Sequence, residues 1–303
     1  IEAGAPKAAL AGRNLGQDFD PNQSWRMYHG TTVPGFPQHP HRGFETVTIV
    51  TEGLVDHADS LGAAGRFGNG DVQWMTAGKG VLHSEMFPLL HSDQDNPLEL
   101  FQIWLNLPGK NKLVEPHFKM LWTDDIPRIS GSDANGHQWE INLIAGQHSD
   151  QHALAPPPHS WAADPKHDVQ IWTIRLEPHA TLELPAFSGL AHRNVYYYQG
   201  ESLQIGGKEV KVEHVVEMAP DTLCTLVNGD QTSSLLLLQG VPIGEPVAQY
   251  GPFVMNTQAE IQQAFQEFRA TQFGGWPWPT DDQVHDLNRG RFALHADGRE
   301  EVK

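Results

Sequence analysis

Two short triplets carry the side chains best suited to chemistry, His39-Pro40-His41 and His83-Ser84-Glu85. Successive residues of a strand point to opposite faces, so each triplet can present its first and third side chains to one ion. Pro40 favours an extended conformation of the residue before it and stiffens the first pair. The chain between the triplets is long enough for hairpins that bring the two pairs to opposite walls of a small barrel.

Three neutral imidazoles and one carboxylate form a mixed nitrogen and oxygen donor set. This set suits Fe(II), Mn(II), Ni(II), Cu(II) or Zn(II), and the donors alone do not choose among these ions. With octahedral coordination, such a set leaves positions open for water, O2 or a substrate. Structural zinc sites are usually closed by protein ligands and often use cysteine, which neither triplet contains.

A histidine pair in a chain with 17 histidines is, by itself, more often a surface feature than a metal site. The surrounding segment favours a metal site, because eight glycines between Gly43 and Gly80 mark the tight corners of a small barrel. Glu45 is expected on the same alternating face as His39 and His41, followed inward by apolar residues. That face would run from the donor groups into an apolar core.

Short alternating runs separated by glycine and proline predict an all-β protein. The clearest predicted strands are 46–50, 71–75, 100–105, 139–144, 170–176, 194–198 and 235–239. One helix is predicted over 257–271, where Thr257 and Glu260 have the spacing of a capping box and apolar residues follow at helical spacing.

The predicted domain boundary lies in the proline-rich stretch 148–165, which is poor in aliphatic residues. We expect an N-terminal barrel over 1–150 and a C-terminal barrel over 151–303 that includes the helix 257–271 and a tail. The tail is rich in proline and is expected to lie across a surface without regular structure.

Longer stretches around the two triplets, HPHRGFETVTIV and GDVQWMTAGKGVLHSE, resemble the signature of the pirin family of cupins. The stretch GEPVAQYGPFVMNTQAEIQQAFQEFR is similar to the segment in which pirins place their C-terminal helix. The resemblance covers about 37–273. It implies a jelly-roll bicupin, an all-β chain of two cupin-type β-sandwich barrels with a C-terminal helix.

The resemblance also implies the ligands of one divalent metal ion, His39, His41, His83 and Glu85, with Fe(II) expected and Mn, Ni, Cu or Zn as alternatives. The wider cupin pattern would use Glu45 as the carboxylate. Pirins take it from the His-Ser-Glu triplet instead, so Glu45 is expected to be a hydrogen-bonded carboxylate behind the ligands or in the core.

The second half of the chain lacks matching pairs, since it has His192-Arg193-Asn194 and later Ala219-Pro220-Asp221. The C-terminal barrel is therefore expected to be metal-free. Cys224 lies in a strand-like run and is expected to be buried and inert.

Two functions of different classes follow from the resemblance. The first is a quercetin 2,3-dioxygenase-like enzyme that cleaves a flavonol or a related aromatic enol with O2, with Glu85 as the catalytic base. The second is a non-enzymatic, metal- or redox-responsive regulatory protein that acts through protein partners. Both functions need the same site.

Bulk composition argues against nucleic-acid and membrane partners, although a small local basic patch is compatible with it, and it leaves a protein partner open. The formal charge of −17 opposes binding to the phosphate backbone, so no direct nucleic-acid binding is expected. No apolar run approaches the roughly 20 residues of a membrane helix, so no membrane segment is expected. A single cysteine excludes an internal disulfide and favours a cytoplasmic location.

Overall fold

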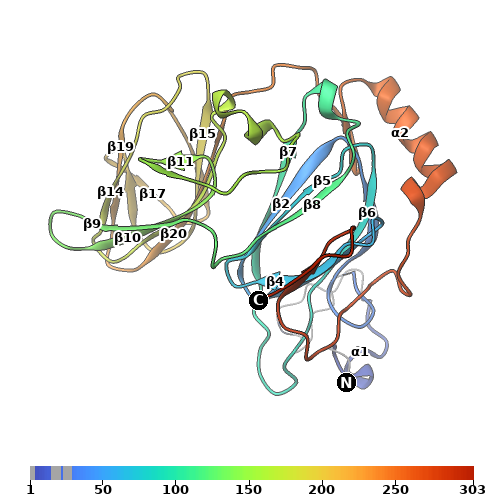
Figure 1. Ribbon diagram of the computed structural model, residues 1–303. Coiled ribbons are helices and arrows are strands. Elements are labelled where there is room, and N and C mark those ends of the chain that lie inside the picture. The colour runs from blue at the N-terminus through green and yellow to red at the C-terminus, as the bar shows by residue number, and fades with distance from the viewer. Residues whose placement is uncertain (1–3, 15–21, 23–28) are drawn as a thin grey trace. The chain divides into compact units, whose positions relative to one another are not determined.

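The computed structural model describes residues 4–14, 22 and 29–303, and these form two compact units (Figure 1). The first unit contains the chain up to Thr123 together with Glu245–Lys303, and the second contains Asp124–Gly244. The boundary predicted at 150/151 therefore lies inside the second unit. The helix and the tail belong to the first unit, whereas the sequence assigned them to the C-terminal domain.

The strands of the first unit are β1 (Gly35–His41), β2 (Phe44–Glu52), β3 (Leu54–Asp59), β4 (Ala64–Gly68), β5 (Val72–Thr76), β6 (Val81–Met86), β7 (Glu99–Asn106), β8 (His117–Leu121), β21 (Ala248–Tyr250), β22 (Phe253–Met255), β23 (Phe292–Leu294) and β24 (Glu300–Val302). One antiparallel sheet has the order β1-β6-β3-β4-β23-β24, and a second has the order β7-β2-β5-β8. β21 and β22 form a separate hairpin. Val50 of β2, Phe67 of β4 and Phe118 of β8 pack in one apolar cluster, which joins the two sheets into a β-sandwich barrel.

The strands of the second unit are β9 (Arg128–Ser132), β10 (Gln138–Ala145), β11 (Gln147–His148), β12 (Gln151–His152), β13 (Gln170–Leu176), β14 (Thr181–Leu184), β15 (His192–Gln199), β16 (Leu203–Ile205), β17 (Lys208–Val210), β18 (His214–Met218), β19 (Cys224–Asn228) and β20 (Ser233–Gly240). They form sheets of the order β18-β15-β20-β13-β10-β9 and β14-β19-β16-β17, with β11 and β12 as a hairpin. β10 pairs with both β9 and β13, and this pairing places 128–145 in the second barrel.

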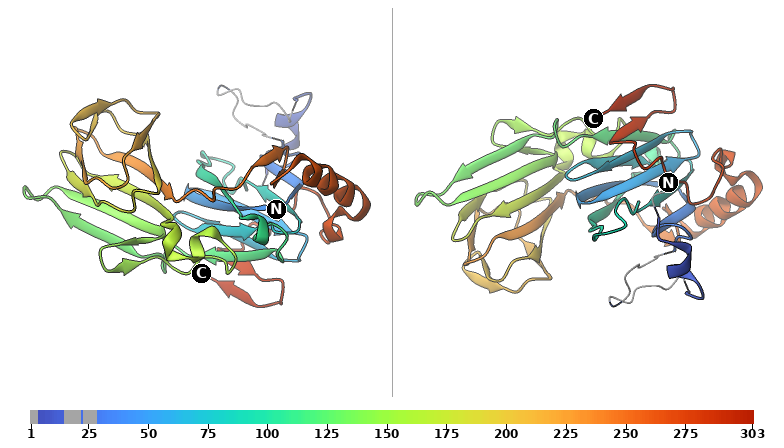
Figure 2. Two further views of the ribbon diagram at one scale, coloured as in Figure 1. Left: turned by 90° about the horizontal axis from the view of Figure 1, so that it is seen from above. Right: turned by 90° about the horizontal axis from the view of Figure 1, so that it is seen from below.

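The helix α2 (Gln258–Thr271) confirms the predicted helix. Oγ1 of Thr257 accepts a hydrogen bond from the N–H of Glu260 at 3.2 Å, and the Glu260 carboxylate accepts one from the N–H of Thr257 at 2.7 Å. This is a capping box. Ile261 and Ala264 are buried against the hairpin β21–β22, so α2, the orange helix in Figures 1 and 2, packs on the first unit. The other helical segments are short: α1 (Lys7–Leu10), η2 (Gly109–Asn111), η3 (Trp161–Ala163), η4 (Pro165–His167) and η5 (Gln272–Gly274).

The tail after α2 packs on the six-stranded sheet of the first unit, which contains β3 and β4. Trp278 donates its indole N–H to the carbonyl of Asp59 at 2.8 Å. Arg66 of β4 is buried, pairs with Asp56 at 2.6 Å and donates to three carbonyl groups of 285–289. β23 then pairs with β4, so the prediction of a tail without regular structure is wrong for β23 and β24.

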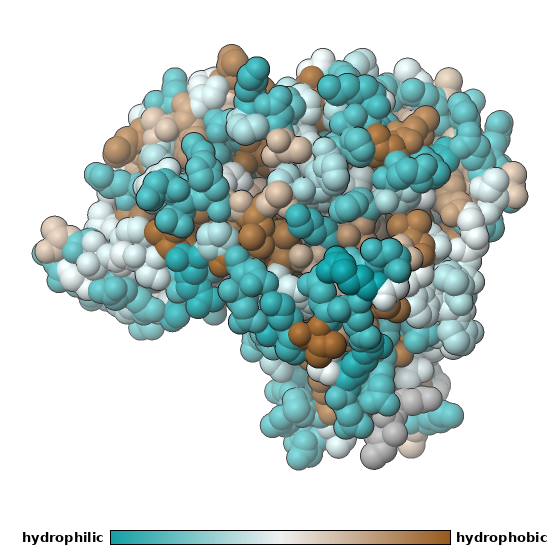
Figure 3. Space-filling view, in the orientation of Figure 1, coloured by the Kyte–Doolittle hydropathy of each residue, from teal (hydrophilic) through white to brown (hydrophobic). Residues whose placement is uncertain are grey.

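None of the helices in the described residues is long and apolar enough to cross a membrane. On the face shown in Figure 3, hydrophilic side chains predominate and hydrophobic ones are scattered among them. This surface fits a chain with a formal charge of −17.

Candidate metal centre

Three histidines converge inside the first unit, two from β1 and one from β6. The strands pair so that His39 lies opposite His83, and His41 follows on the same face of β1. The ring centroids are 4.4 Å apart for His39 and His83 and 4.8 Å apart for the other two pairs. One nitrogen of each ring lies within 4.8 Å of the others, so the three side chains could hold one metal ion.

Backbone carbonyls fix the orientation of the two β1 histidines. Nδ1 of His39 lies 2.9 Å from the carbonyl of Pro37, and Nδ1 of His41 lies 3.4 Å from the carbonyl of Pro252. A ring nitrogen that faces a carbonyl carries the proton, which leaves the Nε2 lone pair free.

Three of the ring nitrogens have no hydrogen-bond partner in the described part of the chain. They are Nε2 of His41 and both nitrogens of His83, and all are buried. Buried polar atoms are rarely left unpaired. A divalent metal ion is the partner that fits several converging imidazole lone pairs, so these residues fit such an ion.

Burial keeps the three imidazoles neutral. It lowers the pKa of His39, takes the pKa of His41 to about 3 and lowers the pKa of His83 well below its usual value. The neighbouring imidazole of His39 lowers the pKa of the other two further. Neutral imidazole is the form that binds metal ions.

Glu85 lies beside the histidines on β6 and is 4% exposed. Its Oε2 is 3.9 Å from Nε2 of His83. Gln102 donates from Nε2 to both carboxylate oxygens, at 2.9 and 2.7 Å, and Thr48 donates its hydroxyl at 3.2 Å. The structure thus places the fourth residue expected from the sequence next to His83, held by two side chains from the opposite sheet.

Glu45 lies on a different strand face from the residues that contact Glu85. It is buried and accepts a hydrogen bond from the Thr76 hydroxyl at 2.6 Å. Thr48, which contacts Glu85, is three residues further along β2 and so faces the other side of the strand. The expectation that Glu45 shares a face with His39 and His41 is therefore wrong.

A turn between β1 and β2 causes this change of face. Gly43 has a φ of +86°, and a Cβ there would lie 2.0 Å from the carbonyl oxygen of Val254, so the turn requires glycine. The buried Lys112 donates from Nζ to the carbonyls of Gly43 and Val254, both at 2.9 Å, and to Oδ1 of Asn106 at 2.7 Å. These bonds fix the hairpin whose Pro252 carbonyl faces the metal site.

The site lies beside the edge strands of two sheets. β1 and β7 are both edge strands, and β7 carries Gln102 and Trp104, which are exposed. The Trp104 ring is 5.4 Å from that of His41. Of the two histidines that face each other across β1 and β6, His39 is partly exposed and His83 is fully buried, so the site is nearest to solvent on the His39 side.

A buried polar group lies behind the histidines. The ring of His57 is 5.6 Å from that of His83 and stacks on Phe118. Gln73 donates from its side-chain amide to Nδ1 of His57 at 3.0 Å. Nε2 of His57 lies 3.2 Å from Oδ2 of Asp59. The spacing of His57 and Asp59, two residues apart on one strand, is the sequence signal that could have identified this pair.

The second unit has a different interior. Trp172, Tyr197 and Leu237 fill it, His192 is exposed, and the buried Arg193 donates to Gln239 at 2.7 Å. Among the described residues, only the three histidines of the first unit form a set of converging metal donors. A metal-free second barrel remains a prediction.

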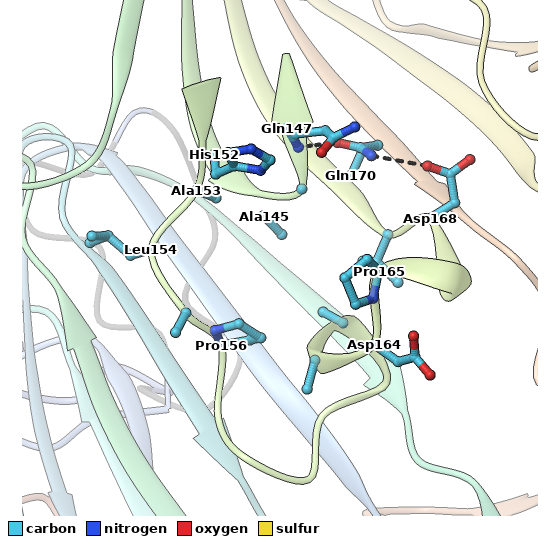
Figure 4. A pocket seen from close by; sticks show the side chains of 15 residues that line it. Ala145, Gln147, His152, Ala153, Leu154, Pro156, Asp164, Pro165, Asp168 and Gln170 are labelled. Carbon is cyan, nitrogen blue, oxygen red and sulfur yellow. Dashed lines mark hydrogen bonds between the residues drawn. The ribbon is translucent and has the colours of Figure 1, made fainter. Parts of the chain in front are cut away.

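A cavity of about 390 Å³ also lies in the second unit (Figure 4). Two of its polar side chains are paired: Gln170 accepts from the N–H of Gln147 at 2.8 Å and donates to Asp168 at 3.1 Å. Small apolar residues such as Ala145 and Ala153 line much of the rest. The cavity offers no converging donor set among the described residues, so the histidine site is the stronger candidate.

Comparisons with known proteins agree with this architecture. Residues 13–105 match the Pirin family model, and 171–274 match the model of the Pirin C-terminal cupin domain. The chain is 37% identical over 258 residues to a Pseudomonas aeruginosa protein named "Putative quercetin 2,3-dioxygenase", covering 84% of this chain and 82% of that protein. It is 32% identical over 277 residues to human pirin, covering 89% of each.

A crystal structure of quercetin 2,3-dioxygenase from Acinetobacter baumannii has a TM-score of 0.69 and 32% identity, with 81% of this chain and 82% of that chain covered. The family models match both barrels, and the matched residues include the β1 histidines and the Cys224 strand. The chain therefore belongs to the pirin family, with an N-terminal pirin domain and a C-terminal pirin cupin domain.

Proposed function

We propose that the protein is a metal-dependent dioxygenase that cleaves a flavonol or a related aromatic enol, as a quercetin 2,3-dioxygenase does. One observation carries the proposal: three histidines converge beside a carboxylate in the first barrel, and His41 and His83 carry unpaired, buried ring nitrogens. The names of the Pseudomonas and Acinetobacter proteins support the reaction class.

His39, His41, His83 and Glu85 hold one divalent ion in this proposal. Their donor set suits Fe(II), the ion we expect, and also Mn(II), Ni(II), Cu(II) or Zn(II). The ion, when bound, supplies Lewis acidity and lowers the pKa of a hydroxyl group bound to it.

Glu85 is the proposed base. A flavonol carries a hydroxyl group beside a carbonyl group, and loss of the hydroxyl proton makes its ring electron-rich enough to react with O2. Oε2 of Glu85, 3.9 Å from Nε2 of His83, can accept this proton from a substrate bound at the histidines. Gln102 and Thr48 hold the carboxylate in place by hydrogen bonds.

Oxygen uptake tests the proposal. Protein loaded anaerobically with Fe(II) should consume O2 when mixed with quercetin, and it should not do so with a flavone that lacks the 3-hydroxyl group. The apoprotein is the control for metal dependence. If the loaded protein consumes no O2 with quercetin or related flavonols, the enzyme proposal fails and the non-enzymatic regulatory function becomes the better explanation.

A further inference from the structure

Trp104 of β7 is a large, exposed aromatic side chain beside the metal site. It is 42% exposed, although a tryptophan left in water forgoes much of the stabilisation that burial gives. Its neighbours toward the interior are His41, at 5.4 Å between ring centroids, and Phe44, at 4.3 Å. Tryptophan is enriched at interfaces, where its ring offers apolar area and its N–H keeps a hydrogen-bond partner.

The ring is held in one orientation. Its Nε1 donates to Oε1 of Gln102 at 3.3 Å. Phe44 packs against it at an interplanar angle of 34°, and His41 meets it nearly edge-on at 72°. An aromatic ring fixed in this way loses little further freedom when a ligand packs on it.

Gln102 connects the ring to the proposed base. The same amide that accepts from Trp104 donates to both oxygens of Glu85, at 2.9 and 2.7 Å. Gln102 and Trp104 are two residues apart on β7 and share a face. They lie on the edge strand β7, and the two histidines His39 and His41 lie on β1, an edge strand of the other sheet.

We infer that Trp104 is a specificity-determining residue, on which a planar, fused-ring aromatic ligand stacks while its chelating oxygens reach the histidine site. Gln102 positions both the Trp104 indole and the Glu85 carboxylate for that ligand. The inference rests on the proposed function and adds to it the surface that selects fused aromatic rings over other chelating molecules. Aromatic stacking in a fixed geometry adds affinity beyond the area buried.

Binding to Zn(II)-loaded protein tests this inference without turnover, because Zn(II) is redox-inert. Quercetin and acetohydroxamate, a small aliphatic chelator, are titrated separately into wild-type protein, Trp104→Ala and Trp104→Phe. We expect Trp104→Ala to weaken quercetin binding about 10-fold and Trp104→Phe to weaken it by less than about 3-fold. Acetohydroxamate binding and zinc content should stay unchanged in both variants.

Tyr196→Ala is the matched control, since Tyr196 is 38% exposed and lies in the second unit. Equal quercetin affinity in wild type and Trp104→Ala overturns the inference and leaves the proposed function standing. Equal losses for quercetin and acetohydroxamate also overturn it, because they show a structural role for Trp104. If wild-type protein binds acetohydroxamate and not quercetin, the flavonol proposal itself fails, and the inference fails with it.

Discussion

Gln102 and Thr48 hold Glu85 by three hydrogen bonds, and backbone carbonyls orient the imidazoles of His39 and His41. The donors of the site are thus placed by groups that bind no metal themselves. Such outer partners commonly change metal affinity or activity 10- to 100-fold when removed. At the residue scale, the chemistry depends on these contacts as much as on the donors.

His41→Ala should abolish stoichiometric metal binding, because the site loses one of three converging imidazoles. Metal bound only by the folded state adds to its stability, by about 4 kcal/mol at a thousand times the dissociation constant. The rise in melting temperature on adding metal should therefore disappear in the variant. His192→Ala, a change at an exposed histidine, should keep the rise. Full metal occupancy in the His41→Ala, Glu85→Ala double variant would contradict the assignment.

Glu85→Gln should retain part of the metal and lose flavonol turnover by about 100-fold or more, the size of general-base effects. The amide keeps an oxygen donor but cannot accept the substrate proton. Steady-state oxygen uptake measures the loss, and metal analysis of the same samples separates it from metal loss. Glu45→Gln is the matched control, with turnover expected near wild type. Loss of turnover in Glu45→Gln alone would move the role to Glu45.

The four expected donors could be read from sequence because they occupy two triplets with strand spacing. The face of β2 on which Glu45 lies could not be predicted, because the turn at Gly43 interrupts the alternation of side-chain directions between β1 and β2. Gln102 and Trp104 show the same two-residue spacing, but alternation alone does not say which face of a strand is turned inward. That depends on the partner sheet.

At the scale of elements, local patterns predicted much of the fold. The predicted strand 170–176 coincides with β13, and the predicted helix is α2 with its capping box at Thr257. These elements carry strong local signals. β23 and β24 are short. β23 forms by pairing with β4, which is distant in the sequence, and β24 pairs with β23, so no local sequence pattern predicts these strands.

α2 also connects to the metal site. Arg42, next to His41, pairs with Glu267 of α2 at 2.6 Å and donates from Nε to the carbonyl of Lys79 at 2.7 Å. Its guanidinium lies 4.5 Å from the centroid of the Phe273 ring. α2 and the residues after it thus contact the chain at the end of β1, and these contacts explain why α2 belongs to the first unit.

A carboxylate of β24 should make the tail sensitive to acid. Burial raises the pKa of Glu301, but hydrogen bonds from Trp122, His295 and Arg299 outweigh this effect and lower the pKa to about 2. Because the folded-state pKa lies below the usual 4.5, the carboxylate stabilises the fold above pH 4.5, and the stabilisation is lost as the pH falls toward 2.

Glu301→Gln should therefore lower the free energy of unfolding at pH 7 by about 1 kcal/mol, a value discounted for solvent screening. The difference from wild type should shrink as the pH falls from 4.5 toward 2. Urea unfolding at pH 7 and pH 3 measures both effects, with the exposed Glu209→Gln as control. The same difference at both pH values would contradict the assignment to Glu301.

At the scale of the whole molecule, the presence of two barrels could be predicted from the sequence, but the residues that belong to each barrel could not. The prolines near 156–158 suggested a boundary, yet β10 before them pairs with β13 after them. The chain then returns from the second unit to complete the first with α2 and the tail. Pairing between segments so far apart is set by packing and cannot be read from local composition.

Net charge sets a further expectation for the whole chain. At a formal charge of −17, the protein should not retard a short DNA duplex at physiological salt, since binding to phosphates relies on Lys and Arg. A gel-shift titration at several salt concentrations, with a basic DNA-binding protein as positive control, measures this. Micromolar binding with a steep salt dependence would show a basic surface that the net charge conceals.

The most direct test of the metal centre is anomalous diffraction from crystals of Fe(II)-loaded protein, recorded on both sides of the iron absorption edge. We expect one strong peak per chain, within about 2.0–2.3 Å of Nε2 of His39, His41 and His83, with a carboxylate oxygen of Glu85 as a further ligand. The second barrel should show no peak. A peak of full occupancy elsewhere, or none at the three histidines in crystals whose protein retains iron, would contradict the proposed centre.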